Sequence, residues 1–350
     1  MKTKIKTIKV NASKSYDILI GNGLLDKVGE IFRERFSAKK IAVITDDRVD
    51  NLYGAKVVNA LNEKGFVVSK FTFPNGEKSK NIDTYADILR FLAKEQITRT
   101  DLIVALGGGV VGDITGFSAS TFNRGVPFVQ IPTTLLSQID SSVGGKTAID
   151  LDEGKNLVGA FYQPSLVLCD IDTLSTLPQQ EFACGMGEGA KYAILDSKVF
   201  ELIEKDFDLL DFIYLCIDYK RQIVEQDEFE KGNRKLLNLG HTLAHGIEKL
   251  SGYTILHGNA VAKGLKIVLQ ASKKHGFIDQ KVFEDCISIL KKCVGENTNL
   301  DCEYDISDLV KVAMLDKKRD GDFINVVMVK GVGACSIEKV KTDELLEYFL

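Results

Sequence analysis

The chain has 350 residues, of which 45% are hydrophobic and 27% charged, and a formal net charge of −4. This length is enough for two domains with separate cores. The acidic balance argues against a nucleic-acid-binding protein, which would show a basic excess. The N-terminus MKTKIKTIKV lacks an apolar signal core and no apolar run reaches the length of a membrane span, so we expect neither a secretory peptide nor a membrane segment.

The first half of the chain alternates short β-branched runs with helical patterns. IKTIKV and YDILIG predict an opening antiparallel pair of strands. An amphipathic helix is expected at 81–96, with Asn81 or Asp83 near its N-cap. Buried strands are expected at 39–47, 66–74, 101–109, 126–132 and 165–170. Strands separated by helices in this way indicate a mostly parallel, Rossmann-like sheet with crossover helices.

After about Pro178 the pattern becomes helical. Apolar residues at three-and-four spacing predict helices near 180–194, 198–226, 235–250, 258–275, 279–293 and 305–315. INVVMV and CSIEKV predict a late hairpin around Lys330–Gly333. The composition change therefore divides the chain into an α/β domain at 1–178 and a mainly α-helical domain at 179–350.

Seven cysteines are scattered along the chain without a Cys-x-x-Cys pair. An odd number of dispersed cysteines is typical of a reduced cytoplasmic protein with buried thiols. The same pattern disfavours a zinc site made of thiolates.

A glycine loop follows one of the predicted strands. Gly107–Gly112 fits G-x-G-x-x-G and opens a helix with Asp113 in its first turn, which suits a diphosphate at a helix N-terminus. A plain structural turn is the equally weighted alternative, because glycine-rich strand ends are common. Asp46 ends an earlier strand, upstream of the glycines, so a bound dinucleotide would imply a strand order other than the standard one. Glu77 and Lys80 lie in a turn that would face such a cofactor or be solvated.

Three of the four histidines, His241, His245 and His257, fall within seventeen residues. Histidine combines metal ligation with proton transfer near neutral pH. His241 and His245 are four residues apart and would share one helical face, and His257 follows a glycine-containing break that lets it fold back beside them. The pattern favours a metal or proton-transfer site over ordinary polar or capping residues.

The densest polar stretch lies at 124–164, between apolar strands. Arg124, Asp140, Lys146, Lys155 and Asn156 are expected to pair or to bind a ligand, since charges among apolar strands are costly alone. GGKT at 144–147 resembles the end of a phosphate-binding loop, but Asp140 stands where that loop needs glycine, which excludes it. Lys146 is expected on a glycine-flanked loop.

These runs resemble a known family. PTTLLSQIDSSVGGKTAI and GKNLVGAFYQP are similar to the 3-dehydroquinate synthases of the shikimate pathway. The likeness continues in PNGEKSK, GGGVVGD, FACGMGEGAKYAIL, LNLGHTLAHGIE and LHGNAVAKGL, over roughly residues 39–320 in the family's order. Several other sugar phosphate cyclases share the architecture but lack the GGKTAI and KNLVGAFYQP wording.

The resemblance implies one NAD and one zinc ion, which cobalt can replace. It implies an NAD-binding domain, a metal- and substrate-binding domain, and an active site in the cleft between them. The implied metal ligands are Glu188, His241 and His257, and an O,N,N set leaves positions open for substrate. Without the resemblance, Glu188 and Lys191 would be taken for a common surface pair. His245 is implied near the substrate phosphate or its proton path.

The resemblance also assigns the remaining site residues. The implied substrate or catalytic residues are Arg124, Asp140, Lys146, Asn156, Lys191, Lys220, Arg234, Asn238, His245 and Lys317. The implied cofactor-binding residues are Asp46, Glu77, Lys80, Gly108, Gly109, Asp113, Thr133, Thr134, Leu136, Asp140, Lys146, Lys155, Thr173 and Thr176. Taken singly, each basic residue is more often a solvated charge.

The implied reaction turns 3-deoxy-D-arabino-heptulosonate 7-phosphate into 3-dehydroquinate and phosphate. NAD is transiently reduced, phosphate is eliminated, the hydride returns, the ring opens and an intramolecular aldol step closes the carbocycle. We therefore expect a cytoplasmic carbon–oxygen lyase of aromatic amino acid biosynthesis, acting as a homodimer. The alternatives are another sugar phosphate cyclase, a metal-dependent alcohol dehydrogenase of related architecture, and a non-catalytic NAD- or metal-sensing protein.

The chain departs from the family's usual sequence motifs at a few positions. Gly187 and Gly189 flank Glu188 where the family usually has AEVIKYG, which predicts a looser helix. Asp150 stands at a common Asn position and Asn259 at a common Glu position.

Overall fold

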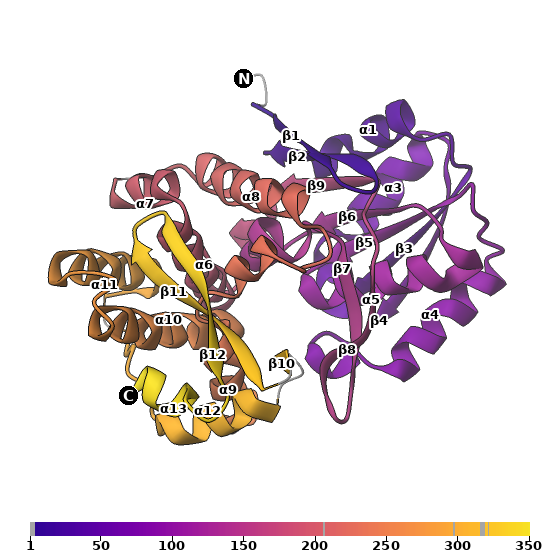
Figure 1. Ribbon diagram of the computed structural model, residues 1–350. Coiled ribbons are helices and arrows are strands. Elements are labelled where there is room, and N and C mark those ends of the chain that lie inside the picture. The colour runs from indigo at the N-terminus through magenta and orange to yellow at the C-terminus, as the bar shows by residue number, and fades with distance from the viewer. Residues whose placement is uncertain (1–3, 206, 297, 316–318, 321) are drawn as a thin grey trace. The chain divides into compact units, whose positions relative to one another are not determined.

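The computed structural model describes residues 4–205, 207–296, 298–315, 319–320 and 322–350, and the chain divides into two compact units, Met1–Leu177 and Pro178–Leu350 (Figure 1). Lys317, an expected substrate residue, lies outside the described residues. All seven cysteines are free, and five of them are buried. None of the helices in the described ranges is both long and apolar enough to cross a membrane.

The first unit is built on a seven-stranded sheet in the order β1-β2-β9-β6-β5-β3-β4 (Figure 1). The predicted opening pair is confirmed, with β1 (Lys6–Asn11) antiparallel to β2 (Ser15–Gly21). Every other neighbouring pair is parallel. These strands are β3 (Lys40–Asp46), β4 (Val67–Phe73), β5 (Leu102–Gly107), β6 (Phe128–Pro132) and β9 (Leu166–Asp170). The mostly parallel Rossmann-like class is thus confirmed.

The strand order reverses next to β3. The chain passes from β3 outward to β4 and then returns to β5 on the other side of β3. Ligands of open parallel sheets bind outside the carboxyl ends of the strands at such a reversal. Asp46 at the end of β3 and the glycines after β5 therefore lie at the edge of the sheet where a ligand is expected. The strand with the acid precedes the strand with the glycines in the sequence, as the upstream position of Asp46 implied.

Helices cover both faces of this sheet because its strands are apolar on both sides. Ile41 and Val43 of β3 face one core with α1 (Val28–Arg35) and α3 (Ala55–Glu63). Ala42 and Ile44 face the other core with α4 (Ile82–Lys94) and α5 (Gly109–Thr121). Asn81 is the N-cap of α4, and its side chain accepts a hydrogen bond from the backbone N–H of Thr84.

A hairpin of β7 (Lys146–Leu151) and β8 (Gly154–Phe161) lies outside the main sheet. The loop expected around Lys146 is therefore wrong, because Lys146 is the first residue of β7. Gly144 (φ 93°) and Gly145 (φ 69°) make the turn that precedes the strand. Ile149 is fully buried in the core shared with α4 and α5, which anchors the hairpin to the unit.

The second unit is mainly helical, with a small antiparallel sheet in the order β10-β11-β12. Its helices are α6 (Gln179–Leu195), α7 (Ser197–Glu204), α8 (Leu209–Gln226), α9 (His241–Leu250), α10 (His257–Lys274), α11 (Gln280–Val294), α12 (Ile306–Leu315) and α13 (Leu345–Phe349). Its strands are β10 (Arg319–Asp320), β11 (Phe323–Gly331) and β12 (Ala334–Lys341), so the late hairpin is confirmed. α6 packs against α7, α10 and α11.

Two helices of the second unit differ from the prediction. The helix expected at 198–226 is two helices, because Asp208 accepts a hydrogen bond from the Leu210 N–H and starts α8 afresh. The helix expected at 235–250 is a 3-10 helix, η7 (Asn233–Asn238), followed by α9. Gly240 separates them with a left-handed backbone (φ 78°) that closes one helix before the next begins.

Short helical segments complete the chain. They are η1 (Leu25–Lys27), α2 (Asp47–Val49), η2 (Asp50–Gly54), η3 (Glu77–Ser79), η4 (Phe122–Arg124), η5 (Ser137–Ser141) and η6 (Ile171–Thr176). Four of them, α2, η3, η5 and η6, follow the carboxyl ends of parallel strands and carry candidate cofactor residues or lie next to them.

Candidate functional site

Three metal-ligating side chains converge in the second unit. Glu188 lies in the middle of α6, His241 begins α9 and His257 begins α10. One ligand atom from each lies within 4.8 Å of the other two. Glu188 is 1% exposed and His241 is 9% exposed, so this carboxylate is held where an unpaired charge is costly.

Two glycines allow this convergence. A Cβ on Gly187 would lie 2.2 Å from the carbonyl oxygen of Gly258, and a Cβ on Gly258 would lie 1.8 Å from that of Cys184. The backbones of α6 and α10 are therefore in contact. Glu188 and His257, the chain neighbours of Gly187 and Gly258, lie close together as a result. α6 runs unbroken through Gly187 and Gly189, and the lower helix stability expected from these glycines stays a prediction.

Nδ1 of each histidine contacts a residue outside the three-ligand group. Nδ1 of His241 lies 3.1 Å from the carbonyl oxygen of Leu239, to which it can only donate. Nδ1 of His257 lies 3.2 Å from Oε2 of Glu248. Burial lowers the pKa of His257, but the hydrogen bond and charge of Glu248 outweigh it, and the pKa is raised. A donor at Nδ1 leaves Nε2 of each ring as the metal-binding atom.

This donor set fits a zinc or cobalt ion. Oε1 of Glu188 pairs with the ammonium of Lys191, while among the described residues the buried Oε2 has no hydrogen-bond partner. Oε2 lies 3.8 Å from Nε2 of His241. Ligand atoms around tetrahedral zinc lie about 3.3 Å apart, so small side-chain movements would close the group around an ion.

Three of the candidate substrate cations are buried in the same unit. Lys191 and Arg234 are each 1% exposed, and Lys220 is 6% exposed. Lys220 lies in α8 and Arg234 in η7, and these two elements contact one another. Buried cations usually bind an anion or pair with one. Lys220 was a weak candidate from its sequence context, but its burial shows that it is not a solvated surface charge.

The other second-unit candidates lie around the histidines and η7. The ring centre of His245 is 5.7 Å from that of His241 and 6.3 Å from that of His257, and His245 is not part of the three-ligand group. The amide of Asn238 donates to Oε1 of Glu230 at 2.5 Å. The guanidinium of Arg234 donates to the carbonyl of Glu228.

In the first unit, most candidate cofactor residues follow the carboxyl ends of parallel strands. Gly108 is the N-cap of α5, and a Cβ there would lie 3.1 Å from Cγ2 of Thr134. Burial raises the pKa of Asp46, although the backbone N–H of Val49 donates to it. The set consists of Asp46 at the end of β3, Glu77 and Lys80 after β4, Gly108, Gly109 and Asp113 after β5, Thr133, Thr134, Leu136 and Asp140 after β6, and Thr173 and Thr176 after β9.

Lys80 joins the strand ends to the β7–β8 hairpin. It is 4% exposed, and its ammonium donates to Oδ2 of Asp113 at 2.6 Å and to Oδ1 of Asn156 at 2.5 Å. Burial alone would lower the pKa of Lys80, but the charges of Asp113 and Glu77 outweigh it, and the pKa is raised. Lys155 lies 3.6 Å from Glu77, so five predicted residues form one cluster.

The structure brings other candidates together less closely. Thr173 is 1% exposed and donates to the carbonyl of Asp170, and the hydroxyl of Thr176 lies 2.5 Å from that of Tyr53. Both hydroxyls therefore have structural partners. Arg124 is exposed at the end of η4 with a left-handed backbone (φ 61°). Lys146 is exposed at the start of β7.

Several residues that were not among the expected site residues contact candidates directly. They include Glu248 against His257, Glu230 against Asn238, and Asp150 against Asn156. Glu248 had a signal, because it lies seven residues after His241 and so shares a helical face with His241 and His245. Glu230 has no helical register with Asn238, and no local pattern would have found it.

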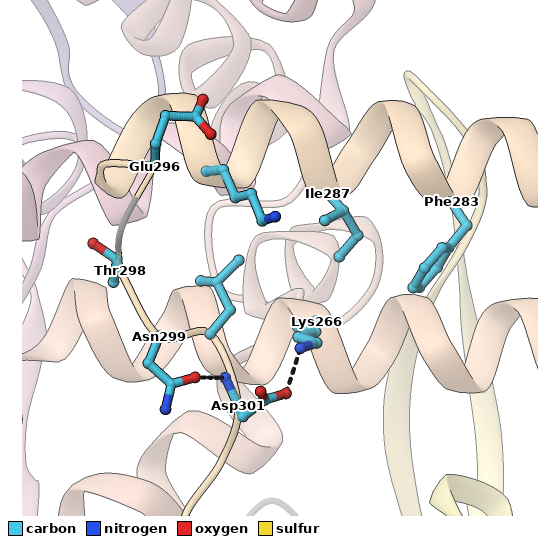
Figure 2. A pocket seen from close by; sticks show the side chains of 9 residues that line it. Lys266, Phe283, Ile287, Glu296, Thr298, Asn299 and Asp301 are labelled. Atoms are coloured by element: carbon cyan, nitrogen blue, oxygen red, sulfur yellow. Dashed lines mark hydrogen bonds and ion pairs between the residues drawn. The ribbon is translucent and has the colours of Figure 1, made fainter.

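A separate hollow of about 370 Å³ lies between α10, α11 and the segment after α11 (Figure 2). Lys266 on its wall is paired with Asp301 at 2.5 Å. The lining residues are Lys266, Phe283, Ile287, Lys291, Glu296, Thr298, Asn299, Leu300 and Asp301. None of them is a candidate site residue, so this hollow is distinct from the metal-ligating group.

Comparisons with known proteins identify the family of the chain. The family model of the 3-dehydroquinate synthase N-terminal domain matches residues 70–184, and that of the C-terminal domain matches residues 185–319. A 3-dehydroquinate synthase of Clostridium acetobutylicum is 43% identical and is aligned over 98% of this chain and 99% of its own.

Solved structures share the fold. A 2-deoxy-scyllo-inosose synthase complexed with carbaglucose-6-phosphate, NAD+ and Co2+ has a TM-score of 0.86 at 24% identity, over 98% of this chain and 99% of its own. An NADH-dependent butanol dehydrogenase A from Thermotoga maritima has a TM-score of 0.63 at 17% identity, over 95% of each chain. From the matching domain models and the near full-length relative, the chain belongs to the 3-dehydroquinate synthase family.

Proposed function

We propose that this protein is a 3-dehydroquinate synthase, a lyase that converts 3-deoxy-D-arabino-heptulosonate 7-phosphate into 3-dehydroquinate and phosphate with NAD and a divalent metal. The observation that carries the proposal is the convergence of Glu188, His241 and His257 in a chain that matches curated synthases over nearly its whole length. A buried carboxylate with two oriented imidazoles is a catalytic rather than a structural metal site.

The second unit would bind the metal and the substrate. A zinc ion held by Glu188, His241 and His257 would supply Lewis acidity, which would lower the pKa of a substrate hydroxyl and favour hydride transfer from the carbon that carries it. Glu248 and the Leu239 carbonyl orient the two imidazoles. Lys191, Lys220 and Arg234 would neutralise the phosphate and carboxylate of a sugar phosphate, and their burial keeps water from screening that attraction.

His245 and Asn238 would complete the substrate site. His245 is beside the metal ligands without being one of them, so it is placed to hold the substrate phosphate or move a proton. Asn238 would bond a hydroxyl or the phosphate. Lys317 keeps its expected role only through the family likeness.

The first unit would hold NAD at the reversal of strand order. Gly108 and Gly109 let the backbone approach the diphosphate at the N-terminus of α5, and Asp46 lies where a carboxylate can accept hydrogen bonds from ribose hydroxyls. Thr133 and Thr134 follow the end of β6. Lys80 follows the end of β4, and Asp113 lies in α5 after the end of β5. Arg124, Asp140, Lys146 and Asn156 would serve the substrate from this unit.

The test is an assay on purified, metal-loaded protein with NAD and the heptulosonate phosphate. We expect release of phosphate with formation of an equal amount of 3-dehydroquinate. Folded, metal-loaded protein that releases neither product would overturn the proposal. Turnover of a different heptulose or hexose phosphate in competition would instead identify another sugar phosphate cyclase. A homodimer stays a prediction that sedimentation equilibrium can test.

A further inference from the structure

The turn residues after β4 and the β7–β8 hairpin are closed into a ring by three hydrogen bonds. The backbone N–H of Asp150 donates to the carbonyl of Lys80 at 2.8 Å. Oδ1 of Asp150 accepts from the backbone N–H of Asn156 at 2.7 Å. Oδ1 of Asn156 accepts from the ammonium of Lys80 at 2.5 Å, which returns the ring to its start.

The ring holds one residue in an unusual backbone conformation. Asn156 has φ 56° inside β8, although a β-strand residue normally has a negative φ. Asparagine adopts this left-handed conformation more readily than most residues but still needs support from its surroundings. The Asp150 carboxylate gives that support by binding the Asn156 N–H, and the reversed backbone is what turns the side-chain amide toward Lys80.

The ring also fixes a buried charge. The ammonium of Lys80 lies between the Asn156 amide and the carboxylate of Asp113, 2.6 Å away, and Lys80 is 4% exposed. The same ammonium feels the charges of Glu77 and Asp150. Displacing Asn156 would therefore remove one of the groups that determine the direction of the Lys80 side chain.

We propose that Asp150 is a positioning residue of the cofactor site: it clamps the left-handed backbone of Asn156 and thereby aims the Asn156 amide and the Lys80 ammonium. The inference rests on the proposed function in assigning Lys80 and Asp113 to NAD. It adds a residue that touches neither cofactor nor substrate and acts through Asn156.

The test compares Asp150→Ala, which removes the acceptor, with Asp150→Asn, which keeps a side-chain oxygen to accept from Asn156. Asp152→Ala is the matched control, because Asp152 is exposed in the turn of the same hairpin. NAD is titrated into each full-length protein. We expect the dissociation constant to rise about tenfold in Asp150→Ala, as for loss of one hydrogen bond at a charged group, and to change less than about threefold in the other two.

A double-mutant cycle separates positioning from general stability. Asn156→Gly keeps the left-handed backbone at no steric cost but removes the amide. We expect the double variant Asp150→Ala with Asn156→Gly to bind NAD no more weakly than Asn156→Gly alone, because Asp150 acts through that amide. Hydrogen exchange of residues 154–161 should quicken in Asp150→Ala while the thermal midpoint stays unchanged.

Additive losses in the cycle would overturn the proposal, as would an unchanged NAD affinity in Asp150→Ala despite faster exchange at Asn156. Equal losses in Asp150→Ala and Asp150→Asn would show that the charge acts rather than the clamp, and would overturn it too. A wild-type protein that binds NAD but makes no dehydroquinate contradicts the proposed function alone, since the affinity comparison still decides the role of Asp150.

Discussion

At the scale of single residues, the metal-ligating side chains are oriented by neighbouring groups that are not ligands themselves. Glu248 is 5% exposed and lies 3.2 Å from Nδ1 of His257, which leaves Nε2 for an ion. A carboxylate behind a ligating histidine fixes its tautomer and its orientation. The group is therefore preorganised by residues that never touch the ion.

Glu248→Ala should weaken zinc binding by about 10- to 100-fold, since His257 would lose its orienting partner. Competition against a chromophoric chelator measures the zinc affinity of the protein in the absence of substrate. Glu201→Ala is the matched control, because Glu201 is exposed on α7. An unchanged zinc affinity in Glu248→Ala would show that helix packing alone orients His257.

His245→Ala should leave bound zinc unchanged and lower turnover by at least about tenfold. The reason is that His245 lies beside the ligand group but outside it, where we propose that it holds the substrate phosphate or moves a proton. Metal content by atomic emission and the rate of phosphate release are measured on one preparation. Loss of zinc from this variant would make His245 a ligand instead.

At the scale of elements, the contact of α6 with α10 determines the ligand geometry. Gly187→Ala would place a methyl group 2.2 Å from the carbonyl oxygen of Gly258, so the two helices must separate. We expect a lower thermal midpoint together with at least about tenfold weaker zinc binding, because Glu188 and His257 move apart with their helices. Gly189→Ala is the comparison, since its methyl group would meet the outer edge of the Phe212 ring, which a side-chain rotation can relieve. Equal zinc affinities in both variants would contradict the role of the helix contact.

The start of β3 and the start of β5 are joined by one buried carboxylate. Asp101 accepts from the backbone N–H groups of Lys40 and Thr98 and from the Thr98 hydroxyl. Burial works to raise the pKa of Asp101, but the hydrogen bonds from Thr98 and Lys40 outweigh it, and the pKa is lowered. A lowered folded-state pKa means that the ionised carboxylate stabilises the fold above its ordinary pKa and that this contribution is lost as the pH falls through the folded-state value.

Asp101→Ala should therefore lower the free energy of unfolding by about 2 kcal/mol at pH 7, from the loss of hydrogen bonds to a charged group. The deficit should shrink as the pH falls below the ordinary carboxyl pKa of 3.8, because the wild-type carboxylate then becomes protonated. Urea unfolding at several pH values measures both effects. Asp87→Ala should stay within about 0.5 kcal/mol of wild type at every pH, because Asp87 pairs with Arg90 on an exposed helix face.

Sequence patterns predicted the helices and strands whose apolar residues repeat with a clear period, such as β3, β5 and α4. They missed the β7–β8 hairpin, because its glycines and charges read as a loop and only the buried Ile149 ties it to a core. They also missed the break before α8, which depends on a single cap at Asp208. At the site, spacing alone grouped His241 with His245, whereas Glu188 came only from the family likeness because it lies far upstream on another helix.

At the scale of the whole molecule, the fold is shared by enzymes with different outcomes. The cyclase structure matches with a TM-score of 0.86 and the butanol dehydrogenase with 0.63. A fold of this kind does not decide between them, because function resides in the site. The buried cations Lys191, Lys220 and Arg234 do favour a phosphorylated, acidic substrate over a simple alcohol.

The two outcomes differ in the fate of the cofactor. A synthase returns the hydride to its substrate, so NADH should never exceed the enzyme concentration while phosphate accumulates over many turnovers. A dehydrogenase would form one NADH for each substrate oxidised. Ultraviolet absorbance and a phosphate assay on the same sample separate the two, with a chelator-treated sample that should regain phosphate release when zinc is restored. NADH rising in step with product would place this chain with the dehydrogenases despite its sequence, whereas phosphate release with formation of 3-dehydroquinate and no net NADH would support the synthase.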